Sequence, residues 1–122
     1  MKPGIAFQVT GKPVPKQSTR FGNKRAYLDP KIEAWQQAVT WEAKAAAQMA
    51  DWDMLTGDVA ARLIFYLPDR RRRDIDNLSK AVLDAMNGII YKDDTQVQKL
   101  VVDKKVSRDK PGVFVIVRPI DG

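Results

Sequence analysis

The run at residues 59–67, VAARLIFYL, constrains the fold of this chain more than any other segment. Apolar side chains fill every second position, which places them on one face of an extended strand: Val59, Ala61, Leu63, Phe65 and Leu67. The opposite face also carries apolar residues, as a strand with neighbours on both sides does: Ala60, Ile64 and Tyr66. Residues 51–57 read as a turn before the run, and Pro68 ends it because proline has no N–H to donate. The sequence therefore predicts a sheet with this strand at its centre.

Two amphipathic helices are expected beside this strand. Asp29 before Pro30 is an N-cap pattern, and apolar residues then recur at helical spacing to about Ala50. A second apolar stripe begins at Ile75, and Gly88 is the expected C-terminal cap of that helix. The other side of the second helix is polar at one-turn intervals, with Asp76, Lys80, Asp84 and Asn87.

Three more strands complete the expected fold. Residues 5–10 alternate apolar and polar side chains, and residues 11–28 form a basic loop. Residues 100–106 and 113–117 also alternate and are separated by Lys110-Pro111-Gly112, which predicts an antiparallel hairpin. The order strand, helix, strand, helix, strand, strand predicts an α/β protein of the α+β type, with two helices covering a small mixed sheet of about four strands. We expect one domain over residues 1–122.

Composition limits the chemistry that the chain can perform. It has no cysteine and no histidine, which excludes disulfides, thiolate metal sites and imidazole catalysis. Any bound metal is therefore expected to have oxygen ligands, which suits Mg²⁺ or Mn²⁺. The net charge of +6 favours a polyanionic partner such as nucleic acid. No stretch is apolar enough for a membrane span or a signal peptide, so we expect a cytoplasmic protein without membrane contact.

Carboxylates gather where residues 59–67 end and the second helix begins. Asp74 and Asp76 lie where the amides of a helix N-terminus are free, and Asp94 follows the helix in what is often only a turn. If the chain folds back so that Asp94 approaches this pair, carboxylates about 4 Å apart repel one another unless a divalent cation joins them. Such a cluster suits metal-assisted phosphodiester hydrolysis. Lys80, one turn beyond Asp76, is the candidate for the cationic partner.

Four consecutive arginines precede these carboxylates. Each guanidinium can make bidentate contacts with phosphate, so this run is expected to bring a DNA backbone to the metal: Arg70, Arg71, Arg72 and Arg73.

Each candidate also has an ordinary structural explanation. An isolated Asp74 or Asp76 would favour N-capping by about two to one, whereas the doublet beside four arginines favours a site. Asp84 is interpreted as the i, i+4 surface partner of Lys80, and for Lys80 the surface and catalytic interpretations carry equal weight. The tryptophans are interpreted as core or interface residues rather than base-stacking platforms: Trp35, Trp41 and Trp52.

In these residues the sequence resembles the RusA family of Holliday junction resolvases, whose signature Pro-Asp-Arg-Arg-Arg-Arg-Asp-x-Asp-Asn stands here at residues 68–77. The resemblance continues along the second helix and into the turn that follows it, at Leu78, Lys80, Ala81, Asp84, Ala85, Asp93, Asp94, Gln96 and Val97. It implies that the family's metal-binding catalytic aspartates correspond to Asp74, Asp76 and Asp94. It also implies that Lys80 is the catalytic lysine and that Arg73 contacts DNA or assists catalysis.

The resemblance implies a Mg²⁺-dependent homodimer that resolves four-way junctions by paired symmetric nicks in DNA recombination and repair. A clamp on the junction is expected from the basic loop, through Lys16, Arg20, Lys24 and Arg25. That loop departs from the family pattern at residues 13–17, which leaves the cleavage-site preference open. Two alternatives remain, a nuclease for other branched DNA and a non-catalytic basic DNA-binding module. A nucleotide phosphohydrolase fits poorly, because no base pocket is evident.

Overall fold

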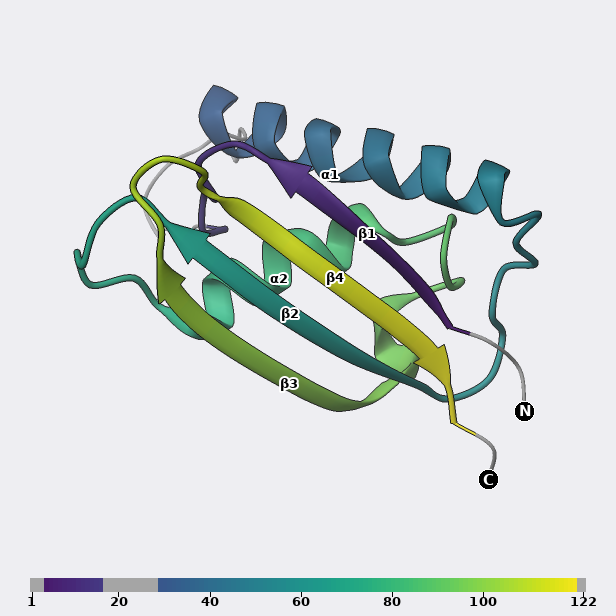
Figure 1. Cartoon of the computed structure of the whole chain (residues 1–122). Coiled ribbons are helices and arrows are strands. Elements are labelled where there is room, and N and C mark those ends of the chain that lie inside the picture. Colours follow the sequence, from purple (N-terminus) through teal and green to yellow (C-terminus); the bar gives the residue numbers. More distant parts are fainter. Residues whose placement is uncertain (1–3, 17–28, 121–122) are drawn as a thin grey trace, which may run out of the picture.

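The computed structural model describes residues 4–16 and 29–120 of the chain (Figure 1). They form four strands, two α-helices and one short 3-10 turn in the predicted order. The elements are β1 (Ile5–Thr10), α1 (Pro30–Met49), β2 (Val59–Leu67), α2 (Ile75–Ala85), η1 (Asp94–Gln96), β3 (Val97–Val106) and β4 (Gly112–Pro119). The predicted fold class, a mixed sheet with two helices, is confirmed.

The strands form one sheet in the order β1-β4-β2-β3. β2 is central, as predicted, with β4 antiparallel on one side and β3 parallel on the other. The prediction of a hairpin between the last two strands was wrong, because β3 and β4 lie on opposite sides of β2 (Figure 1). β3 carries several charged residues and is mostly exposed, which suits an edge strand, whereas the inward side chains of β4 are fully buried.

The turn into β4 depends on a glycine. A Cβ at Gly112 would lie 2.2 Å from the backbone oxygen of Val9 in β1. Lys110-Pro111-Gly112 connects β3 to a strand on the other side of β2, so these residues close no hairpin. This connection allows β4 to enter the sheet directly against β1, and Ser107 N–H, at the end of β3, instead donates to Leu67 O of β2 at 2.7 Å.

Both helices cover the same face of the sheet, and their apolar residues form one core with the alternate residues of the strands. Two hydrogen bonds join the helices across this layer. Gln36 Nε2 donates to Ala81 O at 3.0 Å, and Thr40 Oγ1 donates to Ala85 O at 2.8 Å. These bonds fix the position of α2, the helix that begins at the aspartate doublet.

The helix ends largely follow the sequence signals. Asp29 caps α1 and accepts a hydrogen bond from Lys31 N–H at 2.8 Å, and the helix ends at Met49, beside the predicted Ala50. α2 ends at Ala85, with Met86 rather than Gly88 as the cap. Gly88 has a φ of 76° in the turn that follows, a conformation that favours glycine. Among the described residues, no helix has the length and apolar character needed to cross a membrane.

Candidate active site

Asp74 caps α2. Its side chain accepts a hydrogen bond from Asp76 N–H at 2.9 Å, and Asn77 Nδ2 approaches its second oxygen at 3.4 Å. The capping role that the sequence left as an alternative is therefore present. Both Asp74 and Asp76 are exposed, and a carboxylate offers about four acceptor positions, so capping does not prevent Asp74 from binding a cation.

The four arginines do not form one uniform surface. Arg73 has a side chain only 9% exposed, and its guanidinium donates to the Asp69 carboxylate at 2.8 Å and to Arg71 O at 3.2 Å. The hydrogen bond from Arg73, followed by the backbone N–H of Arg71, holds the pKa of Asp69 below its usual range. Arg73 thus stabilises the turn between β2 and α2, while Arg70, Arg71 and Arg72 remain exposed to solvent and available for phosphate.

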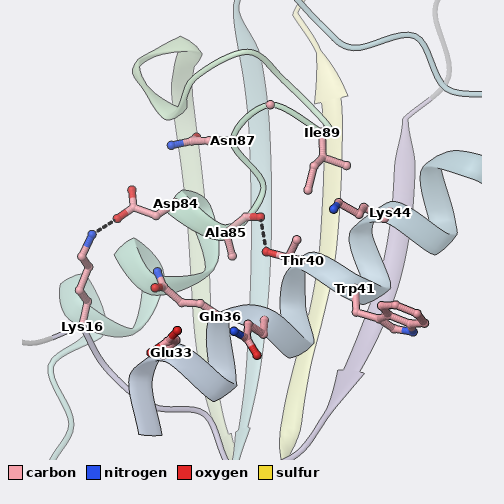
Figure 2. A pocket seen from close by; sticks show the side chains of 12 residues that line it. Lys16, Glu33, Gln36, Thr40, Trp41, Lys44, Asp84, Ala85, Asn87 and Ile89 are labelled. Carbon is pink, nitrogen blue, oxygen red and sulfur yellow. Dashed lines mark hydrogen bonds and ion pairs between the residues drawn. The ribbon is translucent and has the colours of Figure 1, made fainter. Parts of the chain in front are cut away.

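The polar side of α2 is arranged as the helical spacing predicted, with Asp76 and Lys80 exposed. The predicted Lys80–Asp84 surface pair was wrong. Asp84 instead forms an ion pair with Lys16 (Figure 2), whose backbone N–H also donates to Asn77 O at 2.9 Å. Local spacing could not reveal this pair, because Lys16 and Asp84 are 68 residues apart in sequence. Lys80 has no ion pair within residues 4–16 and 29–120.

Asp94 lies beside Asp84. Burial is the main reason that the pKa of Asp94 is raised, and the hydrogen bond and charge repulsion of the Asp84 carboxylate raise it further. Asp93 has another role, since it caps η1, and hydrogen bonds from Thr95 lower its pKa. The structure therefore joins Asp94 to Asp84, which the sequence interpretation had left out of the site. The missed signal was the position of Asp84 on the same polar side of α2 as Asp76.

A buried tyrosine, Tyr91, lies next to the pair Asp84–Asp94. Tyr91 donates its hydroxyl hydrogen to Leu83 O at 2.6 Å. Burial, followed by the negative charges of Asp94 and Asp84, raises the pKa of Tyr91 far above its usual range. The phenol therefore stays neutral and fixes the segment after α2, which carries Asp94, against the last turn of the helix.

The expected grouping of three aspartates is not present in this structure. Within the part of the chain that is described, no three carboxylates lie close enough together to hold one metal ion. Asp76 and Asp84 are eight positions apart on α2, a rise of about 12 Å, so the pair Asp74–Asp76 and the pair Asp84–Asp94 lie toward opposite ends of the helix. Lys80 lies between these two pairs.

The basic loop is described only in part. Lys16, which was predicted to contact DNA, pairs its ammonium group with Asp84 at one end of a groove of about 780 Å³ between α1 and the end of α2 (Figure 2). The DNA contact of Lys16 stays a prediction. Arg20, Lys24 and Arg25, the other predicted clamp residues, lie outside the described residues.

Comparison with known proteins identifies the family. The family model described as "Endodeoxyribonuclease RusA" matches residues 10–118. A "Crossover junction endodeoxyribonuclease RusA" of Aquifex aeolicus is 30% identical over 119 residues, covering 94% of this chain and 91% of that protein. The protein YqaN of Bacillus subtilis is 31% identical over 141 residues, covering 95% of this chain and 96% of YqaN. A "Crossover junction endodeoxyribonuclease RusA" of Shigella sonnei is 38% identical over 79 residues, covering 64% of this chain and 63% of that protein. The chain therefore belongs to the RusA endodeoxyribonuclease family.

Proposed function

We propose that this chain is a Mg²⁺-dependent endodeoxyribonuclease that resolves four-way DNA junctions in recombination and repair. The observation that carries the proposal is the exposed Asp74–Asp76 pair at the start of α2, with Lys80 one turn further, in a chain of this family. Two relatives are named as endodeoxyribonucleases of crossover junctions. We extend that substrate to this chain.

The donor set fits a hard divalent cation. Proteins usually bind Mg²⁺ through one or two carboxylates, with waters and substrate phosphates completing the coordination. Asp74 and Asp76 are exposed and close in sequence, and we assign them as the carboxylates that bind the cation. Asp94 stays a predicted third ligand that must approach the doublet when the cation binds, because in this structure it pairs with Asp84 toward the other end of α2. Bound Mg²⁺, or Mn²⁺ in its place, supplies positive charge at the scissile phosphate and an activated water.

The basic residues around the doublet then have separate tasks. Arg70, Arg71 and Arg72 are exposed directly before α2 and bind the phosphates next to the cut. The Lys80 ammonium stabilises charge that develops on the scissile phosphate. Arg73 contributes indirectly, because its contact with Asp69 sets the shape of the turn that presents the three exposed arginines.

A four-way junction has two-fold symmetry, and so does a homodimer with one site in each copy. We therefore assign the active form as a homodimer that nicks two opposed strands symmetrically. We keep the cytoplasm as the expected location of this activity. Recognition depends chiefly on phosphates and on the shape of the junction, so affinity should fall steeply with salt.

The test compares cleavage of a mobile four-way junction, a flap, a fork and linear duplex in Mg²⁺ and in EDTA. Paired symmetric nicks only in the junction, and only with Mg²⁺, are the expected result. The Asp76→Asn variant should bind the junction and fail to cut it, while Asp58→Asn, at an exposed position before β2, should cut normally.

Two alternatives give different results in the same assay. A nuclease for other branched DNA would cut the flap or the fork as fast as the junction. A non-catalytic DNA-binding module would cut nothing in Mg²⁺, and Asp76→Asn would then change neither binding nor cleavage.

A further inference from the structure

Helix α1 has a second apolar face in addition to the one in the core. Its core face is buried through Ile32, Trp35, Val39 and Ala43. A separate stripe follows the spacing i, i+4, i+7, i+11, i+15, and we call it the outer stripe: Ala34, Ala38, Trp41, Ala45 and Met49. Four of these residues are exposed, and Ala38 is partly buried where the stripe borders the core. Trp41 is 73% exposed and Met49 is 90% exposed. Apolar stripes of this spacing are the surfaces through which helices pack on one another.

Trp41 stands beside a hollow that can receive another side chain. This hollow, of about 250 Å³, is lined by the end of β1 and by Ala38, Trp41 and Glu42 of α1. It has room for much more than a single water, which occupies about 30 Å³ in the liquid. On the other side of Trp41 lies the larger groove, where the indole projects away from Lys16 and Asp84 (Figure 2).

We propose that the outer stripe binds the outer stripe of a second copy of this chain, with the two α1 helices antiparallel and a two-fold axis near residue 39. In this arrangement Ala34 lies opposite the partner's Ala45, and each Trp41 lies over the partner's Ala38. Each indole therefore meets the hollow that Ala38 lines, and both tryptophans become buried. The proposal rests on the homodimer of the proposed function and names the surface that forms it.

Charge favours an antiparallel pair of identical helices. Glu33 and Lys44 both line the groove and so lie on the same flank of α1. The pairings of residue 34 with 45 and of residue 38 with 41 place the axis midway between residues 39 and 40. Glu33 and Lys44 miss exact alignment about this axis by two residues, so each Glu33 meets the partner's Lys44 with a mismatch of about 3 Å along the helix. In a parallel pair each flank faces the partner's other flank, so Glu33 and Lys44, which share one flank, would not meet across the interface. Antiparallel helices also align their macrodipoles favourably.

The first test measures the mass of the full chain by sedimentation equilibrium. The wild type should be a dimer, and Trp41→Glu should raise the dimer Kd by roughly thirtyfold or more, the effect of losing a central aromatic contact. Met54→Glu, at another exposed apolar position, is the matched control and should leave the dimer unchanged. Circular dichroism of each variant checks that it remains folded. A monomeric wild type, or a dimer that Trp41→Glu does not weaken, overturns the proposal.

The second test uses the absence of cysteine from the chain. Two α1 helices with axes about 8–10 Å apart, each with a Cα radius of about 2.3 Å, bring facing Cα atoms within disulfide range. Ala34→Cys mixed with Ala45→Cys should form a disulfide-linked heterodimer under mild oxidation, and neither variant alone should cross-link. Cross-linking of either variant with itself, or none in the mixture, overturns the antiparallel pairing.

The third test exchanges the flanking charges. Glu33→Lys alone places a lysine opposite the partner's Lys44 and should weaken the dimer, whereas Glu33→Lys combined with Lys44→Glu should restore it. Failure of the double variant to recover counts against the proposed register.

Junction cleavage by the wild type separates this proposal from the proposed function. Cleavage of junctions by a wild type whose dimer is insensitive to Trp41→Glu overturns the interface and leaves the nuclease assignment standing. Loss of junction binding in a Trp41→Glu variant that is still dimeric would make the indole a DNA contact and would also overturn the interface.

Discussion

Replacement of Lys80 by alanine should separate catalysis from binding in this protein. Lys80 is exposed on α2, between the pair Asp74–Asp76 and the pair Asp84–Asp94, and no ion pair in the described segments involves it. The substitution removes no buried contact, so we expect the free energy of unfolding to change by less than about 0.5 kcal/mol. Any large effect on cleavage must therefore come from the reaction itself.

The effects on binding and on cleavage should differ greatly. The loss of one phosphate contact lowers the slope of log K against log salt by about 0.9 at most, a small part of an interface with many such contacts. The loss of one group that stabilises transition-state charge costs about 100-fold to 1,000-fold in rate. Lys80→Ala should therefore cut a bound junction at least about 100-fold more slowly while its junction affinity remains near that of the wild type.

Single-turnover cleavage at saturating enzyme gives the rate, and a gel-shift titration in Ca²⁺ at several salt concentrations gives the affinity and its slope. Lys99→Ala, at an exposed position on β3, is the control for general loss of positive charge and should keep both values. Equal losses of rate and affinity in Lys80→Ala would make this lysine a binding residue and refute the reasoning.

Three further predictions follow from individual contacts. Burial and then the Asp84 carboxylate raise the pKa of Asp94, so Asp84→Asn should lower that pKa. If Asp94 must be ionised to bind Mg²⁺, the acid limb of the cleavage pH profile should then move to lower pH. An acid limb that does not move contradicts a role of Asp94 in binding the metal. Arg73→Gln should lower the melting temperature more than Arg72→Gln, because only Arg73 is held within the turn, and thermal scans of both variants at equal salt test this. Gly112→Ala should lower the free energy of unfolding, measured in urea, by about 1–3 kcal/mol or more, because the added Cβ would overlap a backbone oxygen of β1. A smaller loss would mean that β1 and β4 separate easily at this position.

The contacts of Lys16 show how the start of the basic loop relates to α2. Its backbone N–H donates to Asn77 O and its side chain pairs with Asp84, both on α2, and its predicted contact with DNA stays a prediction. The chain that leads into residues 17–28 is thus tied to the same helix that carries the aspartates. A DNA contact through the remainder of this loop stays a prediction.

Local sequence patterns determined the elements of this fold and the first half of its site. Period-two and helical spacing depend only on which side chains share a face, so β1, β2, α1 and the start of α2 could be assigned within one or two residues. The run from Pro68 to Asn77 likewise pointed to a carboxylate doublet beside arginines, since its chemistry depends on residues that are adjacent in sequence.

Tertiary structure decided everything that depends on distant residues. The place of β4 between β1 and β2 required Gly112 to pack against Val9, a contact that no turn motif reports. The pairs Lys16–Asp84 and Asp84–Asp94 form because the chain folds back along α2. Trp41 is on the surface because the core face of α1 is the one that carries Trp35 and Val39. Periodicity shows that a helix has a face but not what will lie against it, because that depends on free energies summed over contacts between segments far apart in the chain.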